Sequence, residues 1–297
     1  MDGNSVKKSD IFSKLKDKNL IVSNGYINGS FTSGEAKKTF DVKDPSNGNL
    51  IISLPDMGIA DVKLAIESAS KAQKSWAAKT GKERSQILRK WYDLIIENKD
   101  DLAKILTAEM GKPLAEALGE ITYGASFVEW FAEEAKRVYG DTIPGHQEDK
   151  RIVVIKQPVG VVGAITPWNF PNAMITRKVA PAIAVGCSVV LRPPTLTPLS
   201  ALALGYLADK AGIPAGVFNI VMGTDSSGMG KELCSNELVR KITFTGSTEV
   251  GRILMRQCSD QIKKVSLELG GNAPFIVFDD ADTVSYTHLT LPTKVTG

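Results

Sequence analysis

The sequence predicts an α/β protein with a doubly wound parallel sheet that carries helices on both faces. After residue 159, short apolar segments alternate with longer amphipathic ones, and such alternation is typical of parallel strands connected by covering helices. The chain has 297 residues, of which 43% are hydrophobic and 23% charged, so it can build a sizeable core. Ligands of such sheets bind at the carboxyl ends of the strands, where we expect the functional residues.

Composition argues against several classes of protein. Lys and Arg number 36 against 33 Asp and Glu, and a net charge of +3 is too small and too dispersed to predict nucleic-acid binding. The longest nearly uncharged run, residues 179–191, is too short to span a bilayer. The first twenty residues lack the features of a secretory signal or a transit peptide. We therefore expect a cytoplasmic protein without nucleic-acid or membrane partners.

The three cysteines, Cys187, Cys234 and Cys258, are odd in number and have no paired spacing. This pattern predicts reduced thiols and argues against a disulfide framework or a zinc site.

Residues 1–136 are predicted to contain a polar leader, short strands and four helices. The leader covers residues 1–20, and β-prone pieces follow at 24–31 and 39–42. Asp61 is the expected N-cap of the first helix, and Pro113 opens the fourth. The Trp and Phe residues of these helices are expected in the core. The apolar stripe of the fourth helix comprises Leu114, Leu118, Ile121, Ala125, Val128 and Phe131.

The rest of the chain alternates between strands and helices. Strands are predicted at residues 151–157, 159–166, 188–192, 217–221, 240–245 and 264–269. Helices are predicted at residues 172–185, 198–211, 226–235 and 248–258.

Residues 242–272 carry the first candidate site. The strand ends at Gly246, and Ser247 begins the next helix, so that backbone N–H groups and a hydroxyl would face a phosphate. The following strand places Glu268 before a glycine pair, which suggests a base beside that phosphate site. Two alternatives remain open. The Gly-Ser turn can serve turn and N-cap chemistry alone, and Glu268 can be a solvated rim residue.

Two other strand ends carry polar groups. Between Pro167 and Pro171, a stiff loop holds the amide of Asn169, and an immobilised amide donor suits an oxyanion. The alternative is a turn asparagine that satisfies its own backbone. The strand at 188–192 delivers Arg192, followed by Thr195, at the place where the ribose of a dinucleotide lies in such sheets.

Several motifs in order resemble the aldehyde dehydrogenase family, above all its succinate-semialdehyde branch. They are ITPWNFPNAMITRK, LRPPTLTPLSALAL, PAGVFNIV, FTGSTEVG and KKVSLELGGNAPFIVFDDAD, and the resemblance covers about residues 24–282. It implies a Rossmann-like cofactor domain whose amino-terminal part is residues 1–136 and whose main part is residues 159–268. It also implies an oligomerisation hairpin at 137–158, a truncated catalytic domain that starts at 269–282, and a homo-oligomeric full-length parent.

The resemblance also implies NAD(P)-dependent oxidation of an aldehyde, most of all of succinate semialdehyde to succinate. Asn169 would hold the oxyanion of a thiohemiacetal, Glu268 would be the general base, and Arg177 would face the distal carboxylate of the substrate. The alternative for Arg177 is a surface salt bridge. The implied cofactor-lining residues are Pro167, Trp168, Asn169, Arg192, Pro194, Thr195, Gly246, Ser247 and Leu269.

The sequence departs from the family at two places. The family usually has Lys where this chain has Arg192, and Thr195 adds no acidic group that would repel a 2′-phosphate, so NADP is expected beside NAD. The family's nucleophilic cysteine lies beyond the last residue of this chain, and residues 283–297 read as an unrelated tail. We therefore expect the 297-residue chain to be inactive. The alternatives are a catalytically dead nucleotide-binding or assembly fragment and an unstable fragment without function.

Overall fold

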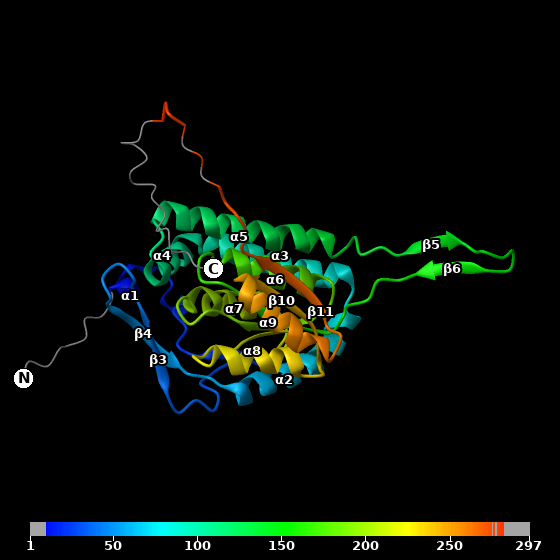
Figure 1. The fold of residues 1–297 in the computed structure, drawn as a ribbon, viewed down its shortest axis with the longest axis horizontal. Helices are drawn as coiled ribbons and strands as arrows, with labels where there is room; N and C mark the ends of the chain where they lie inside the picture. Colours follow the sequence, from blue (N-terminus) through cyan, green and yellow to red (C-terminus); the bar gives the residue numbers. More distant parts are fainter. Residues whose placement is uncertain (1–9, 275, 277, 282–297) are drawn as a thin grey trace, which may run out of the picture.

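The computed structural model describes residues 10–274, 276 and 278–281, and a seven-stranded sheet forms its centre (Figure 1). The strand order is β11-β10-β7-β8-β9-β1-β2. Five neighbouring strands are parallel, and β1 and β2 complete one edge in antiparallel pairing. The bounds are Gly25–Ile27 (β1), Ser30–Thr32 (β2), Val161–Ile165 (β7), Ser188–Arg192 (β8), Phe218–Ile220 (β9), Val239–Gly246 (β10) and Lys264–Leu269 (β11).

The sheet is doubly wound, as the sequence predicts. From β7 the chain proceeds outward through β8 to β9, and then returns to the other side of β7 to form β10 and β11. This reversal places the topological switch point between β7 and β10. Ligands of doubly wound sheets bind in the crevice at the carboxyl ends of the strands at that point.

Helices cover both faces of the sheet. Helices α6 and α7 pack on one face, and α3, α4 and α5 form a further layer over them, whereas α2, α8 and α9 pack on the other face (Figure 1). The bounds are Ile59–Ala78 (α2), Gly81–Glu97 (α3), Lys99–Met110 (α4), Leu114–Glu134 (α5), Ala173–Ala184 (α6), Leu199–Ala211 (α7), Ser226–Ser235 (α8) and Thr248–Ser259 (α9).

Two tryptophans anchor the helical layers. Trp76 and Trp91 are fully buried, and their indole N–H groups donate to the carbonyl oxygens of Ile183 and Leu204 at 2.9 and 3.2 Å. The prediction that the tryptophans of these helices lie in the core is thus confirmed for Trp76 and Trp91. It is wrong for Trp130, whose exposed fraction is 62%. Trp130 lies between the buried Val128 and Ala132 on α5, and a helix turns by about 200° over two residues, so its side chain faces outward. Leu114, also expected in the buried stripe, is 45% exposed in the first turn of α5.

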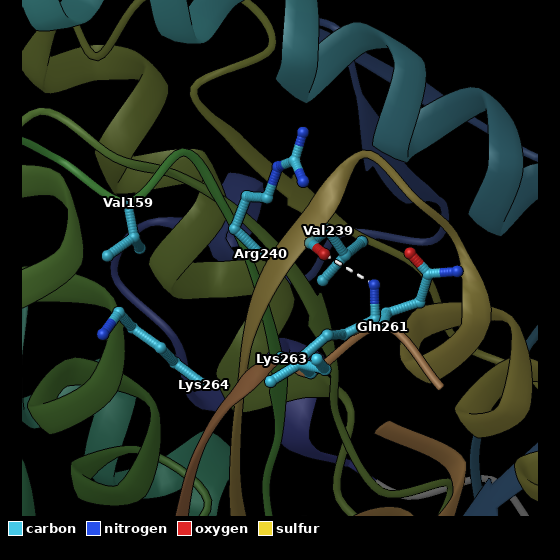
Figure 2. Close-up of a pocket in the computed structure, with 7 residues that line it drawn as sticks. Val159, Val239, Arg240, Gln261, Lys263 and Lys264 are labelled. Atoms are coloured by element: carbon cyan, nitrogen blue, oxygen red, sulfur yellow. Dashed lines mark hydrogen bonds between the residues drawn. The ribbon is translucent and has the colours of Figure 1, made fainter. Parts of the chain in front are cut away.

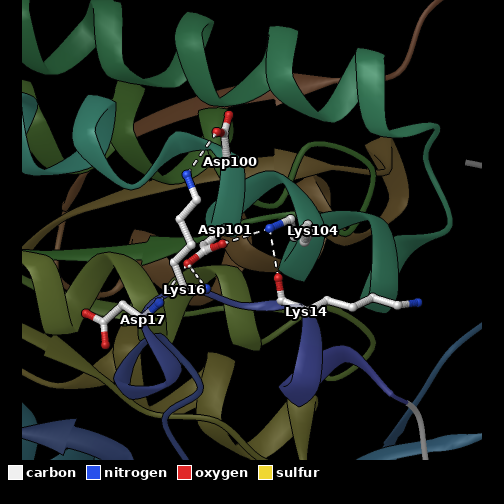
Figure 3. A network of polar contacts seen from close by, with 6 residues as sticks. All are labelled: Lys14, Lys16, Asp17, Asp100, Asp101 and Lys104. Atoms are coloured by element: carbon white, nitrogen blue, oxygen red, sulfur yellow. Dashed lines mark hydrogen bonds and ion pairs between the residues drawn. The ribbon is translucent and has the colours of Figure 1, made fainter.

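The predicted polar leader is wrong for residues 10–20, and residues 1–9 lie outside the described part. Helix α1 (Ile11–Lys14) and a 3₁₀ turn (Lys18–Leu20) precede the first strand, and Leu15, between them, is buried. Asp101 of α4 accepts hydrogen bonds from the backbone N–H groups of Lys16 and Asp17 at 2.7 and 2.9 Å (Figure 3). A buried carboxylate therefore fastens this segment to the helical layer.

The amino-terminal boundary of α2 also differs from the prediction. Asp61 lies inside the helix, where its carboxylate accepts from the N–H of Gly58, the N-cap residue, and from the N–H of Glu35. An acidic side chain in a first helical turn binds free N–H groups just as an N-cap does, which explains the misplacement. Of the hairpin formed by β3 (Thr39–Lys43) and β4 (Leu50–Pro55), only the first strand was expected.

A second hairpin, β5 (Asp141–Pro144) and β6 (Arg151–Val154), projects away from the body of the molecule (Figure 1). All its strand residues are exposed, and β6 ends three residues earlier than expected. Among the described residues, no helix is both long enough and apolar enough to cross a membrane. The cytoplasmic location and the domain boundaries stay predictions, and residues 283–297 lie outside the described part.

Candidate functional site

The carboxyl ends of four adjacent strands form one row. In the register of the sheet, Arg192 of β8 lies beside Ile165 of β7, Ile165 beside Phe244 of β10, and Thr245, next to Phe244, beside Glu268 of β11. Strands are about 4.8 Å apart, so this row spans roughly 15 Å. The polar residues that the sequence places at three strand ends therefore border one edge of the sheet.

Each of the inner strands of this row ends in a buried polar atom without a hydrogen-bond partner among the described residues. These atoms are Oγ1 of Thr166, directly after β7, Nε of Arg192 on β8, and Oγ1 of Thr245 on β10. Buried polar atoms in folded proteins almost always have partners. Three of these atoms lie on neighbouring strand ends, at the place where ligands of doubly wound sheets bind.

The loop after β7 presents Asn169 to solvent. The loop residues Trp168, Asn169 and Phe170 are exposed, and the Asn169 amide has no hydrogen-bond partner among the described residues. This observation opposes the alternative of a turn asparagine that satisfies its own backbone. Pro167, at the start of the loop, is half-buried.

Two residues that sequence reasoning missed hold this loop. Lys112 Nζ donates to the backbone oxygen of Asn169 at 3.1 Å and lies 3.7 Å from the centre of the Phe170 ring. It also forms a buried ion pair of 2.7 Å with Glu120. The other carboxylate oxygen of Glu120 accepts from the N–H groups of Asn172 and Ala173, where α6 begins. The available signal was a charged residue, Glu120, within the apolar stripe of α5.

Arg192 lies at the end of β8 with an exposed fraction of 8%. Its Nη2 donates to the oxygen of Gly223 at 3.3 Å and to the hydroxyl of Ser226, the first residue of α8. Burial lowers the pKa of the guanidinium, and the charge of Asp225 opposes this shift. Next to it, Pro194 is buried and Thr195 half-buried. The structure thus gives the Nη2 of Arg192 two contacts within the fold and leaves its buried Nε without a partner among the described residues.

The turn between β10 and α9 has the local geometry that the sequence predicts. Ser247 is the N-cap of α9, and its hydroxyl accepts from the N–H of Val250 at 3.3 Å. The Ser247 hydroxyl therefore serves as an N-cap, and the first turn of α9 follows directly on the carboxyl end of β10. Gly246 closes the strand, and Gly251 has a packing role, because a Cβ there would lie 2.6 Å from the side chain of Leu269.

Glu268 lies between two cations of α6. Its Oε2 is 3.4 Å from Nη1 of Arg177, and its Oε1 is 3.5 Å from Nζ of Lys178. The Lys178 side chain is 3% exposed, against 32% for Arg177 and 45% for Glu268. Lys178 Nζ also lies 3.3 Å from the hydroxyl of Thr243. Burial lowers the pKa of Lys178, and the Glu268 carboxylate opposes this shift.

The sequence leaves two roles for Arg177, a substrate-binding cation and a partner in a surface salt bridge, and its contacts bear on both. Arg177 does form a salt bridge, but its partner is the candidate base. Its guanidinium also lies 5.3 Å from the centre of the Phe127 ring, and Phe127 packs edge-to-face with Tyr123 of α5 at 4.8 Å. Lys178 was missed, although a lysine beside the buried Val179 of α6 was a usable signal.

The three cysteines lie away from this edge. Cys187 precedes β8, and Cys234 and Cys258 lie near the carboxyl ends of α8 and α9, each of which leads into the amino end of a strand. All three are buried, and burial raises the pKa of the Cys187 thiol. The hydrogen bond with Cys234 lowers the pKa of Cys258, but a buried thiol of any of the three is a poor nucleophile because a substrate cannot reach it. Among residues 10–274, 276 and 278–281, no group of three or more potential metal-binding side chains is present.

A basic pocket lies at the opposite edge of the sheet (Figure 2). It has a volume of about 260 Å³ and is lined by Arg240, Lys263 and Lys264 together with uncharged residues. Lys263 Nζ donates to the backbone oxygens of Asn236 and Val239, both at 2.6 Å. One of the three cations of the pocket, Lys263, is thus bound to the backbone. The pocket lies apart from the carboxyl ends of the strands.

Comparisons with known proteins show the family to which this chain is similar. A model of the aldehyde dehydrogenase family matches residues 31–294. The chain is 61% identical over 269 residues both to a glutarate-semialdehyde dehydrogenase of Pseudomonas aeruginosa and to the succinate-semialdehyde dehydrogenase (NADP(+)) of Escherichia coli. Each match covers 91% of this chain and 56% of the relative, so the chain spans about half the length of these relatives.

A solved structure gives the same result for the fold. The crystal structure described as an E. coli NADP-dependent enzyme superposes with a TM-score of 0.87 at 60% sequence identity. The match covers 90% of this chain and 56% of that chain.

Proposed function

Because this chain belongs to the aldehyde dehydrogenase family, we propose that it supplies the cofactor-binding half of an NAD(P)-dependent enzyme that oxidises an aldehyde with an acidic group at its far end. The observation that carries the proposal is the row of strand ends at the switch point. It places an uncommitted amide (Asn169), a carboxylate (Glu268) and a buried cation (Arg192) along one edge.

The cofactor proposal rests on the unpartnered atoms of that edge. Thr166, Arg192 and Thr245 offer two hydroxyls and a guanidinium N–H to a bound group, and the first turn of α9 offers backbone N–H groups to a phosphate. Such a set fits a dinucleotide, which would supply the hydride acceptor when bound. Arg192 adds a positive charge without an acidic neighbour at Thr195, which supports NADP beside NAD. The other proposed lining residues are Pro167, Trp168, Asn169, Pro194, Gly246, Ser247 and Leu269.

Two residues have the chemistry for the reacting end of the substrate. Asn169 would donate its amide N–H to the oxygen that gains negative charge when a thiol attacks the aldehyde. Glu268 would accept a proton from the water that hydrolyses the resulting thioester. Lys178 would hold the Glu268 carboxylate in place, because it is buried and close to Thr243. The thiol would come from outside this chain, since the three cysteines present are buried away from the edge.

Arg177 supports the acidic class of substrate. It is a half-buried guanidinium next to the proposed base, and a guanidinium binds a carboxylate through two parallel N–H donors. The relatives named above act on succinate or glutarate semialdehyde according to their names. We propose this class, an aldehyde with a distal carboxylate, for the complete protein.

The exposed hairpin supports assembly of the complete protein into a homo-oligomer. Val153 and Ile155 are each 68% exposed, and Ile143, which pairs with Ile152, is 43% exposed. Apolar side chains on an unpaired two-stranded ribbon favour pairing with another chain.

A second function also fits the chain by itself. Its described cysteines cannot attack a substrate at the carboxyl edge, so the isolated chain would bind a nucleotide, or take part in assembly, without catalysis. Both functions predict that the cofactor binds, but only the first predicts oxidation of an aldehyde.

A chimaera tests the first function. Residues 1–282 of this chain are followed by the part of the E. coli relative that the chain does not match, and NADPH formation is measured with succinate semialdehyde and with butanal. We expect faster turnover with succinate semialdehyde and loss of turnover in Glu268→Gln. A folded chimaera that binds NADP but oxidises neither aldehyde would contradict the proposal.

A further inference from the structure

The carboxylate of Glu268 contacts two cations that differ in burial and in their other contacts. Lys178 is almost fully buried, and its Nζ lies 3.3 Å from Thr243 Oγ1. Movement of this side chain away from Glu268 would break that contact and its packing. Arg177 is ten times more exposed, at 32% against 3%. Its contacts are the 3.4 Å ion pair, the Phe127 ring and a 3.9 Å contact with the sulfur of Met174. Arg177 is therefore the partner that can be exchanged.

The charges of this cluster do not balance. Arg177 and Lys178 carry two positive charges against the single negative charge of Glu268, and neither cation has another ion-pair partner among the described residues. An uncompensated, partly desolvated positive charge attracts an anion. Within the described residues, the cluster therefore has a net charge of +1, which favours the approach of one further carboxylate.

We propose that the acidic group of the substrate displaces Arg177 from Glu268, so that binding of the far end of the substrate releases one oxygen of the base while Lys178 retains the other. The inference rests on the proposed function, in which Arg177 faces that acidic group and Glu268 is the base. It adds that the two carboxylates compete for the same guanidinium.

Two physical arguments favour displacement over sharing. The Arg177–Glu268 contact of 3.4 Å is longer than the 2.7–2.9 Å of a good charge-assisted hydrogen bond, so a bidentate carboxylate forms the better pair. Two carboxylates on one guanidinium would also place like charges within a few ångströms of each other. The Phe127 ring, which Tyr123 supports, can keep the guanidinium in reach of both positions.

This exchange would make the rate of thioester hydrolysis depend on whether the aldehyde carries an acidic group. An aldehyde without an acidic group would leave Arg177 on Glu268, and the base would keep both of its cations during hydrolysis of the thioester. An acidic aldehyde would bind and release the base in one event. Interactions that change between the bound states alter kcat rather than KM alone.

Binding of glutarate to the 297-residue chain tests the proposal directly. Nuclear magnetic resonance follows the Arg177 Nε–H signal, which is assigned by its loss in Arg177→Gln, and millimolar dissociation constants are measurable. If Glu268 competes with glutarate, Glu268→Gln should bind it about two- to fivefold more tightly than the wild type, which is the strength of a partly exposed ion pair. Glu249→Gln is the matched control, because it removes the same charge from the exposed first turn of α9.

Three results would overturn the inference. Equal or weaker binding by Glu268→Gln would show that Arg177 serves both carboxylates together. Equal tightening in Glu249→Gln would assign the effect to overall charge. Absence of glutarate binding in both the wild type and Glu268→Gln would show that the cluster takes no second anion. A titration of the same samples with NADP separates these results from failure of the proposed function, which requires the cofactor to bind.

Discussion

Arg177 of α6 and Glu268 at the end of β11 form an ion pair, with 3.4 Å between Nη1 and Oε2. The pair joins a candidate substrate-binding cation to the candidate base, although the two residues belong to different helix–strand units. Lys178 completes the cluster from the buried side. The candidate functional residues at these strand ends therefore interact with one another.

The purified 297-residue chain should not oxidise succinate semialdehyde. Its three cysteines are buried and lie away from the carboxyl edge, so no thiol can attack the aldehyde there. Reduction of NADP or NAD is followed by absorbance in the presence of the aldehyde. Cofactor-dependent turnover that Glu268→Gln abolishes would refute this prediction.

Lys112→Met should destabilise the fold by about 3–5 kcal/mol, the cost of breaking a buried ion pair. Glu120 would keep its two backbone N–H donors but lose its cation, and Asn169 would lose the donor to its backbone oxygen. Urea unfolding measures the loss. The double variant Lys112→Met with Glu120→Gln removes the uncompensated charge and should recover part of it. A double variant less stable than the single one would contradict this account.

Glu109 should make stability depend on pH. Its carboxylate accepts from the N–H groups of Leu199 and Ser200 at 2.7 and 2.8 Å, and burial raises its pKa to about 7. The stabilising contribution of a group with a raised pKa is fully present below the unfolded value of about 4.5 and is lost as the pH rises to about 7. The expected loss is at most about 3 kcal/mol.

Two variants test the contribution of Glu109 to the pH dependence of stability. The free energy of unfolding of Glu109→Gln should change less between pH 4.5 and 7 than that of the wild type, whereas Glu116→Gln, at an exposed position of α5, should follow the wild type. Identical pH profiles for Glu109→Gln and the wild type would show that Glu109 does not titrate in this range.

Asp101→Ala should release the segment before β1. The carboxylate accepts from two backbone N–H groups and from Lys104 Nζ at 3.0 Å (Figure 3). Burial opposes the charge, but these three donors hold the pKa of Asp101 below its usual range. Its contribution to stability is therefore present above about pH 4 and is lost only at more acidic pH.

Limited proteolysis at neutral pH measures this effect. Cleavage within residues 10–20 should become faster in Asp101→Ala. Asp100→Ala is the control, because its carboxylate is 54% exposed and lies 3.9 Å from Lys16. Equal cleavage rates in the two variants would contradict the anchoring role of Asp101.

The parallel sheet was predictable because each of its inner strands is short, apolar and bounded by turn residues. The buried strand at 188–192 has the predicted bounds, and so does the edge strand at 264–269. A buried strand and a helix N-cap each leave a distinct local pattern. Ser247 illustrates the second pattern.

The remaining features depend on tertiary contacts. Nothing near Lys112 in the sequence shows that its ammonium reaches Glu120 and the backbone of Asn169, and the outward direction of Trp130 follows from how α5 lies on its neighbours. The pairing of Arg177 with Glu268 likewise requires the placement of α6 beside β11. Local periodicity carries no information about such pairs.

Calorimetric titration of the chain with NADP tests the central claim, that the carboxyl ends of β7, β8 and β10 form a dinucleotide site. The variants are Arg192→Gln, at this edge, and Arg240→Gln, an exposed arginine of the pocket at the opposite edge (Figure 2). We expect NADP to bind the wild type and Arg240→Gln equally, and to bind folded Arg192→Gln about tenfold or more weakly, the value of a hydrogen bond to a charged group. Absence of NADP binding by the folded wild-type chain, or equal weakening in both variants, would contradict the claim.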